Sequence, residues 1–235
     1  MAIASASLPK MGVIMLNTAF PRPVGDIGNA ATFRGNVVYE VVEAATVSRV
    51  MGGMGQDETL AGGFLAARDR LIEQGAQIVT TSCGVLVFYQ DDLAKGCGTP
   101  IVASSLFQVA RRRKEFAGPV GILVMDSRSL TPAHLEAAGC PPDSPVAGLE
   151  NGTELHRVLK ANSPAVPLDP EHAKQDVIAA ARHILEEAPQ TAAFVMECTN
   201  LPPYRAALEQ ALGLPVFDIL TWLEEIWRDE QVRRT

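Results

Sequence analysis

The chain has 235 residues, of which 47% are hydrophobic and 20% are charged, and its formal net charge is −7. This composition is typical of a globular protein, long enough for one large domain or for two lobes of about 110 residues each. The acidic balance argues against binding to nucleic-acid phosphate, and we interpret the short basic run at 111–114 as the solvated end of a helix.

The first ten residues, MAIASASLPK, contain no charged leader followed by a long apolar stretch, and no run approaches the roughly 18 apolar residues that span a bilayer. We therefore expect a cytoplasmic protein that does not enter a membrane. Its four cysteines, Cys83, Cys97, Cys140 and Cys198, are expected to be free thiols because disulfides are rare in the cytoplasm.

The first half of the chain contains three short apolar runs with the composition of buried parallel strands, at 12–16 (GVIML), 77–83 (QIVTTSC) and 99–105 (TPIVASS). Between the first two, a helical pattern over 57–74 places Leu60, Phe64 and Leu71 on one side. This pattern stops at Gly75, a residue type that often ends helices.

The second half repeats these runs in the same order. GILVM at 121–125 follows its counterpart by 109 residues, while AAFVMEC at 192–198 and LPVFDIL at 214–220 follow theirs by 115. Helices are expected from the capping pair Asp169–Pro170 onward, over 201–212, and from Thr221 to the end. Strands that alternate with helices indicate parallel sheets joined by right-handed crossovers.

We therefore predict an α/β fold with two pseudo-symmetric lobes, each with a mostly parallel sheet flanked by helices. The first lobe is predicted to cover 1–113 and the second 114–213, with the last strand and helix, 214–235, returning to the first lobe. Duplicated lobes usually face each other across a cleft, so the active site is expected there.

Cys83 and Cys198 each follow the same strand of the repeat. The carboxyl ends of parallel strands are where ligands and catalytic groups collect, and a following helix N-terminus favours a thiolate. We therefore expect two accessible, acidic thiols that face each other, so that one removes a proton from a bound carbon and the other returns one. Cys97 and Cys140 have no repeat partner and are interpreted as structural or surface thiols.

The motifs SCG around Cys83 and ECTNLP around Cys198 resemble the aspartate/glutamate racemase superfamily, which includes hydantoin racemases. The resemblance implies two lobes with one catalytic cysteine each, racemisation by two-base proton transfer without a cofactor, and a possible homodimer. It matches Thr199 to a residue that helps to hold the substrate carboxylate. Asn200 stands where glutamate racemases usually have histidine and aspartate racemases have glutamate.

One departure from the superfamily concerns the residues after the first cysteine. Gly84 and Val85 stand in place of the usual Asn-Thr, which removes two hydrogen-bond donors and argues against aspartate or glutamate as the substrate. The loop after the first strand, 16–33, is also longer and richer in glycine and proline than the short Asp-Ser turn of the superfamily.

Further candidate substrate-binding residues lie at the ends of the predicted strands. They are Asn17, Thr18 and Arg22 in the first loop, Ser82, Gly84 and Val85 beside the first cysteine, Ser127 (with Asp126 and Ser129) after the fourth strand-like run, and Thr199 and Asn200 after the second cysteine. Arg22 offers a fork for a carboxylate. The alternative is that the glycines and prolines of loop 16–33 only shape turns.

The sequence contains neither a dinucleotide-binding fingerprint nor a P-loop, and its histidines lack metal-site spacing, so we expect no cofactor and no metal. The leading hypothesis is a racemase or epimerase of a small amino acid or amino-acid derivative that bears a carboxylate. The alternatives are a cis–trans isomerase or a decarboxylase of a small dicarboxylate on the same scaffold, or a non-catalytic ligand-binding relative.

Overall fold

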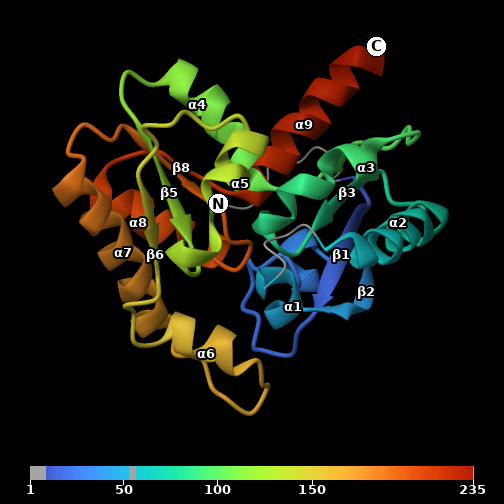
Figure 1. Ribbon diagram of the computed structural model, residues 1–235, viewed down its shortest axis with the longest axis horizontal. Coiled ribbons are helices and arrows are strands. Elements are labelled where there is room, and N and C mark those ends of the chain that lie inside the picture. The colour runs from blue at the N-terminus through green and yellow to red at the C-terminus, as the bar shows by residue number, and fades with distance from the viewer. Residues whose placement is uncertain (1–8, 53–56, 235) are drawn as a thin grey trace.

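The computed structural model describes residues 9–52 and 57–234, which form two lobes built on one parallel sheet each (Figure 1). The first sheet has the order β2-β1-β3-β4 and consists of β1 (Met11–Asn17), β2 (Val37–Thr46), β3 (Ile78–Thr81) and β4 (Ile101–Val102). The second has the order β6-β5-β7-β8 and consists of β5 (Val120–Val124), β6 (Val146–Gly148), β7 (Ala193–Met196) and β8 (Val216–Phe217). The predicted two-lobe α/β fold is confirmed.

The internal repeat covers all four strands of each sheet. β5 and β6 begin 109 residues after β1 and β2, and β7 and β8 begin 115 residues after β3 and β4. The same order of strands in both sheets follows from this repeat, because each strand occupies the position of its counterpart.

The helices connect and cover the strands. In the first half they are η1 (Ala30–Phe33), α1 (Val47–Gly52), α2 (Glu58–Glu73), η2 (Gly84–Tyr89), α3 (Gln90–Ala94), η3 (Ser105–Gln108) and α4 (Val109–Glu115). In the second half they are η4 (Ser127–Ser129), α5 (Pro132–Ala137), α6 (Leu155–Ala161), α7 (Pro170–Glu187), η5 (Pro202–Tyr204), α8 (Arg205–Leu212) and α9 (Ile219–Arg234).

The two long connecting helices start where their capping residues predict. The Asp57 carboxylate accepts a hydrogen bond from the Thr59 N–H at 2.9 Å and begins α2. The Asp169 carboxylate accepts from Glu171 N–H at 2.9 Å, and Pro170 occupies the first helical position of α7. Both caps satisfy N–H groups that the first turn of a helix leaves free.

Each sheet is buried on both faces. In β1, Ile14 and Leu16 point towards the core under α2, whereas Met11, Val13 and Met15 point towards the core that contains α9. In the second lobe, β5 and β7 similarly divide between the core under α7 and α8 and the core that contains residues of α4 and α5. Successive residues of the central strands must therefore all be apolar, as is usual for parallel strands covered on both sides.

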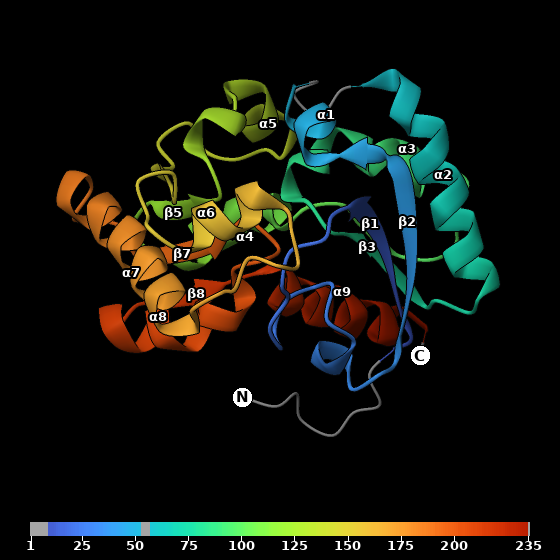
Figure 2. The same cartoon turned by 90° about the horizontal axis from the view of Figure 1, so that it is seen from below.

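The last strand is not where the sequence analysis placed it. β8 pairs in parallel with β7, through Phe194 with Val216 and Val195 with Phe217, and so belongs to the second sheet. Only the helix that follows it returns to the first lobe: Ile219, Trp222 and Leu223 of α9 pack into the same cluster as the outer face of β1 (Figure 2). The apolar pattern of a two-residue strand is too short to predict which sheet the strand joins.

The helices that follow β4 and β8 each cover the sheet of the other lobe. Leu106 and Val109, at the start of the first of these segments, pack with Ile122 and Val195 of the second sheet, whereas α9 packs on the first sheet. The internal repeat accounts for this arrangement, because the segments after β4 and β8 are equivalent and each passes from its own lobe to the sheet of the other. It ties the two lobes together through two buried apolar cores.

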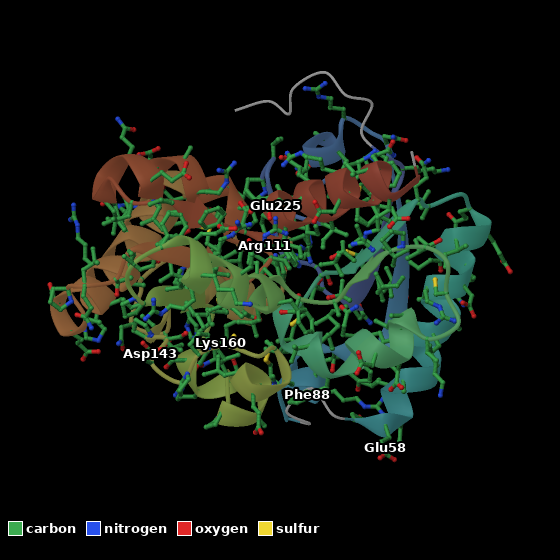
Figure 3. All side chains as sticks on the ribbon, turned by 90° about the horizontal axis from the view of Figure 1, so that it is seen from above. Glu58, Phe88, Arg111, Asp143, Lys160 and Glu225 are labelled. Carbon is green, nitrogen blue, oxygen red and sulfur yellow. The ribbon has the colours of Figure 1, made fainter. Side chains whose placement is uncertain are left out.

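Polar contacts join the two crossing segments to each other. The Arg112 guanidinium forms an ion pair with Glu225, and Arg111 lies 3.6 Å from the same carboxylate (Figure 3). The Gln108 amide donates a hydrogen bond to the Asp218 carbonyl at 3.0 Å. These contacts link the two lobes through the segments that follow β4 and β8.

Among the described residues, no helix combines the length and the apolar composition that crossing a membrane requires.

Two adjacent glycines in α2 provide a test of how tightly this helix packs on the first sheet. A Cβ added at Gly62 would meet nothing within 4 Å, whereas one added at Gly63 would lie 2.9 Å from Val42 Cγ1 of β2. Gly62→Ala should stabilise the protein by about 0.5–1 kcal/mol through helix propensity. Gly63→Ala should be about 1–3 kcal/mol less stable than Gly62→Ala, because Val42 must move. Urea unfolding measures the difference, and equal stabilities would contradict this packing.

Candidate active site

A cavity of about 460 Å³ lies between the two lobes. Its walls come from matching elements of the repeat: the segments that follow β1, β3, β5 and β7, together with α1 from the first lobe and α6 from the second. Parallel sheets place the carboxyl ends of their strands at one edge, so the two lobes present equivalent edges to the same space.

The two predicted catalytic cysteines occupy equivalent positions in this cavity. Cys83 comes two residues after the end of β3, Cys198 comes two residues after the end of β7, and both side chains line the cavity. Cys83 is partly buried and Cys198 is 8% exposed. Cys97 and Cys140 are not among the lining residues, as expected for thiols without a repeat partner.

Most of the other candidates also border the cavity. The lining residues include Thr18, Arg22, Ser82, Gly84, Val85, Thr199 and Asn200, and also Asp126 and Ser129. Their contacts with a substrate stay predictions.

Two candidates, Asn17 and Ser127, are engaged elsewhere and do not line the cavity. The Asn17 amide donates to the Glu43 carboxylate at 2.9 Å, at the point where the pairing of β1 with β2 shifts register. The Ser127 hydroxyl is hydrogen-bonded to Glu150. Their contacts with a substrate stay predictions, and their partners lie on neighbouring segments that local sequence does not reveal.

The long loop after β1 docks onto the turn that carries Cys198. Gly25, with φ +104°, packs so closely against Pro203 that an added Cβ would lie 2.9 Å from Pro203 Cα. The Ile27 N–H donates to the Thr199 carbonyl at 3.4 Å. The loop therefore packs on the turn that carries Cys198, and its Thr18 and Arg22 border the cavity.

A hydrogen-bonded chain leads from this loop to the second thiol. Asp26, only 1% exposed, accepts from Arg22 Nη1 at 2.7 Å and from Asn200 Nδ2 at 2.7 Å. The Asn200 Oδ1 in turn accepts from the Cys198 thiol at 3.5 Å. Asp26 thus fixes which way the Asn200 amide faces, and Asn200 fixes the direction of the thiol. Local sequence gave no signal for Asp26, which acts across the lobes.

The two thiol-bearing turns touch directly. The Thr199 hydroxyl donates to the Ser82 carbonyl at 2.7 Å, and Gly84 lies against Glu197, so that an added Cβ would meet the Glu197 carboxyl oxygen Oε1 and lie 2.5 Å from its carbonyl oxygen. The residue after Cys83 must therefore lack a side chain.

Glu197, which immediately precedes Cys198, is buried in this contact. The residue is 3% exposed and lines the cavity, yet its Oε1 has no hydrogen-bond partner among the described residues. Burial raises the pKa of this carboxyl to about 8, so that it holds a proton at neutral pH. The sequence analysis did not single out this residue.

The sequence analysis predicted acidic thiols, but the pKa values of both cavity thiols are raised. Burial, with a smaller contribution from the nearby Glu197, raises the pKa of Cys83 to about 12. The same two causes raise the pKa of Cys198 well above its usual value. Hydrogen bonds from the backbone N–H groups of Val85 and Asn200 act in the predicted direction and lower these pKa values, but burial outweighs them.

The exposed part of the cavity wall carries cationic groups that the sequence analysis missed. Lys160 of α6 lines it, together with Arg128, which is paired with Asp126. Lys160 is exposed and forms no ion pair with a described residue. No cluster of three potential metal ligands occurs in the described part of the chain.

This arrangement suits proton transfer at a carbon atom. It offers two thiols from opposite lobes, a buried carboxyl between the turns that carry them, and cations at the exposed wall. A carbon acid held between the thiols would have a potential base on either side.

Solved structures share this fold over nearly the whole chain. Allantoin racemase from Klebsiella pneumoniae superposes with a TM-score of 0.61 and 16% identity, covering 93% of this chain and 88% of its own. A cysteine-substituted arylmalonate decarboxylase with associated sulfate gives 0.57 at 15% identity, covering 95% and 92%. An aspartate racemase homologue from Pyrococcus horikoshii gives 0.55 at 15% identity, covering 93% and 99%. The predicted two-lobe α/β fold is therefore shared with these structures.

Proteins with similar sequences are named after a different activity. A dimethylsulfoniopropionate lyase of Durusdinium sp. clade D is 28% identical over 215 residues, which cover 89% of this chain and 71% of the relative. Dimethylsulfoniopropionate lyase 6 of Emiliania huxleyi is 29% identical over 227 residues, covering 92% of this chain and 58% of the relative. The chain thus spans little more than half of the latter protein. It matches no protein-family model.

The unpaired carboxyl of Glu197 predicts a pH-dependent stability. Its pKa rises from 4.5 to about 8 on folding, so the native state binds the proton more tightly than the unfolded state. This contribution to stability is fully present below about pH 4.5 and is lost as pH rises to about 8. At about 1.4 kcal/mol per pKa unit, its upper limit is about 5 kcal/mol.

Wild type should therefore lose about 2–5 kcal/mol more unfolding free energy than Glu197→Gln between about pH 5 and about pH 9. Urea unfolding at both pH values measures this difference. Glu136→Gln, which alters an exposed carboxyl of α5, should keep the wild-type dependence. Parallel pH profiles for wild type and Glu197→Gln would show that Glu197 does not enter the native state protonated.

Proposed function

We propose that this protein is a lyase that removes a proton from the carbon next to the carboxylate of a small substrate and thereby expels a leaving group from the following carbon. The observation that supports this most is the pair of thiols, Cys83 and Cys198, that reach one cavity from equivalent strand ends of two lobes. The similar sequences named dimethylsulfoniopropionate lyases suggest the first substrate to test.

In dimethylsulfoniopropionate a dimethylsulfonium group is attached to the carbon that neighbours the acidic one. A thiolate of the protein forms an S–H bond with the α proton, and the C–H electron pair becomes the new C=C bond. The bond between the β carbon and sulfur breaks, and its electron pair leaves with sulfur. The products are acrylate and neutral dimethyl sulfide, and the proton on the thiol later returns to water. The reaction requires no redox partner.

The raised pKa values of the thiols are compatible with this role. A thiol that is hard to ionise yields a strongly basic thiolate, as the weakly acidic proton next to a carboxylate demands. The cost of forming the thiolate is reduced when a cationic substrate occupies the cavity, because an opposite charge nearby favours the ionised form. A sulfonium substrate would thus help to activate its own base.

The substrate carboxylate has a potential partner at the exposed wall of the cavity. Arg22 is already held by Asp26 and Thr18, both at 2.7 Å. Lys160 forms no ion pair with a described residue and lines the same space, so its ammonium group is available for the carboxylate. Thr199 and Asn200, matched to substrate-binding positions by the superfamily resemblance, border the other side.

Racemisation is the second candidate function, and the presence of both thiols favours it. Elimination needs one base, whereas inversion of a stereocentre needs a base on one face and an acid on the other. Both reactions begin with the same carbanion, as does decarboxylation of a malonate. They differ in whether the carbanion expels a neighbouring group or receives a proton from the opposite thiol.

Turnover of dimethylsulfoniopropionate is the first test. Wild type should release dimethyl sulfide and acrylate in equal amounts. At least one of Cys198→Ser and Cys83→Ser, the one that removes the base, should lower kcat/KM by at least about 100-fold, because a hydroxyl is a far weaker acid than a thiol. Cys97→Ser, which alters a thiol outside the cavity wall, should retain activity. Full turnover by both cavity variants would contradict the use of a cavity thiol as the base.

Proton exchange without elimination distinguishes the second candidate. If the enzyme is a racemase, incubation in D₂O with a panel of single-enantiomer amino acids, hydantoins and allantoin should place deuterium at the stereocentre and invert it. For a lyase we expect no inversion across the panel, whereas dimethylsulfoniopropionate is cleaved. NMR and chiral chromatography measure both outcomes, and inversion at a rate above that of cleavage would replace the lyase proposal.

A further inference from the structure

Glu197 stands out among the cavity residues because nothing in the described structure compensates its burial. Its Oε1 lies against Gly84 without a hydrogen-bond partner, although the residue is only 3% exposed. Buried carboxyl groups normally have a partner, since desolvation of an unpaired polar group costs free energy. A group retained at this cost, in the wall of a cavity, points to a partner that arrives with the ligand.

The charges around the cavity are unevenly distributed. Its buried wall holds the Glu197 carboxyl between the turns that carry Cys83 and Cys198. Ionisation of this carboxyl or of either thiol adds negative charge to the wall.

Of the cations that line the cavity, Arg22 has a side chain that is 12% exposed and is paired with Asp26. The other two, Lys160 and Arg128, lie at exposed positions, and the Arg128 side chain is 74% exposed. A ligand that extends from the exposed to the buried wall therefore meets positive groups first and acidic groups last.

From this arrangement we propose that Glu197 is the group that binds the cationic end of the substrate, and that it makes the site selective for small carboxylates that carry an onium group. The inference rests on the proposed binding of a small carboxylate in this cavity. Glu197 is placed next to Cys198, so a cation held by its carboxyl lies close to the reacting carbon when cation and carboxylate are two carbons apart.

Other residues that line the cavity neither pair with the Glu197 carboxyl nor offer a second site for the cation of a ligand. Arg22 is bound to Asp26 at 2.7 Å and also lies over the ring of Phe20, 4.3 Å from its centre, which covers the aromatic face that might otherwise attract a cation. His156 lies 3.7 Å from Asp126. The Ser105 hydroxyl donates to the Glu197 carbonyl at 3.2 Å and not to its carboxyl.

The protonation of Glu197 gives the proposal a signature that simple shape complementarity lacks. Burial raises the pKa of this carboxyl to about 8, and a bound cation lowers the pKa again because it stabilises the ionised form. Binding of a cation near neutral pH should therefore release a proton. The affinity should rise with pH until about pH 8, where the free protein is already ionised.

Three ligands of similar size separate charge from shape. 3-(Trimethylammonio)propionate has the cation but a poor leaving group, 4,4-dimethylpentanoate has the same shape without the charge, and glutarate carries a second carboxylate at that end. By isothermal titration calorimetry wild type should bind the ammonium compound at least about tenfold more tightly than the neutral one, with glutarate weakest. Repeating the titration in buffers of different ionisation enthalpy should reveal the released proton.

Glu197→Gln should remove the preference for the cation and the proton release, while its affinity for 4,4-dimethylpentanoate stays within about threefold of wild type. Glu136→Gln is the matched control, because it removes one carboxyl at an exposed position of α5 that does not line the cavity. It should retain both properties. Near-UV circular dichroism checks that each variant is folded.

Equal binding of the charged and neutral ligands by wild type would overturn the proposal. So would a cation preference that survives in Glu197→Gln, since the anion would then be a thiolate, or one that Glu136→Gln abolishes equally. None of these titrations depends on turnover. A failure to cleave dimethylsulfoniopropionate would therefore remove the lyase proposal and leave the assignment of Glu197 to stand or fall separately.

Discussion

The close contact between Gly84 and Glu197 is the constraint on which the site depends. It brings the turn after β3 against the turn after β7 with no side chain between them, and the Thr199–Ser82 hydrogen bond of 2.7 Å holds them together. Because Cys83 and Cys198 are the residues next to this contact, the two thiols must reach the same cavity. The contact also buries a carboxyl group that no described side chain neutralises.

The rest of the fold maintains this contact from two directions. On the far side, the helices that follow β4 and β8 cross to the opposite sheets and are linked by the ion pair of Arg112 with Glu225. On the near side, the loop after β1 packs on Pro203 and connects Asp26 to the Asn200 amide. The lobes are therefore fixed relative to each other at both ends, which suits a reaction that needs two groups on opposite sides of one atom.

The electrostatics of the site follow from the same burial. Burial keeps the three acidic groups protonated at neutral pH, with the pKa of Glu197 raised to about 8, that of Cys83 to about 12 and that of Cys198 well above its usual value. A substrate with a positive charge changes this balance, because each of these groups ionises more readily beside a cation. Catalytic power and substrate selectivity would then have a common origin, at the expense of some stability.

The repeat, the parallel strands and the capped helices could be predicted because each is encoded within a short stretch. β2 and β6 were missed: β2 is a partly exposed edge strand that carries Glu40 and Glu43, and β6 has only three residues. The paired cysteines and most neighbours could be predicted from the repeat. Asp26, Glu197 and Lys160 could not, because their roles arise only when segments from both lobes meet.

The central claim is that one thiol from each lobe faces the same small space, and a bifunctional thiol reagent tests it most directly. Treatment of the folded protein with dibromobimane at mildly alkaline pH, followed by peptide mapping, should give one fluorescent bridge between Cys83 and Cys198. Its formation should be blocked by a ligand that fills the cavity. Separate adducts on these two cysteines, or a bridge that involves Cys97 or Cys140, would contradict the account.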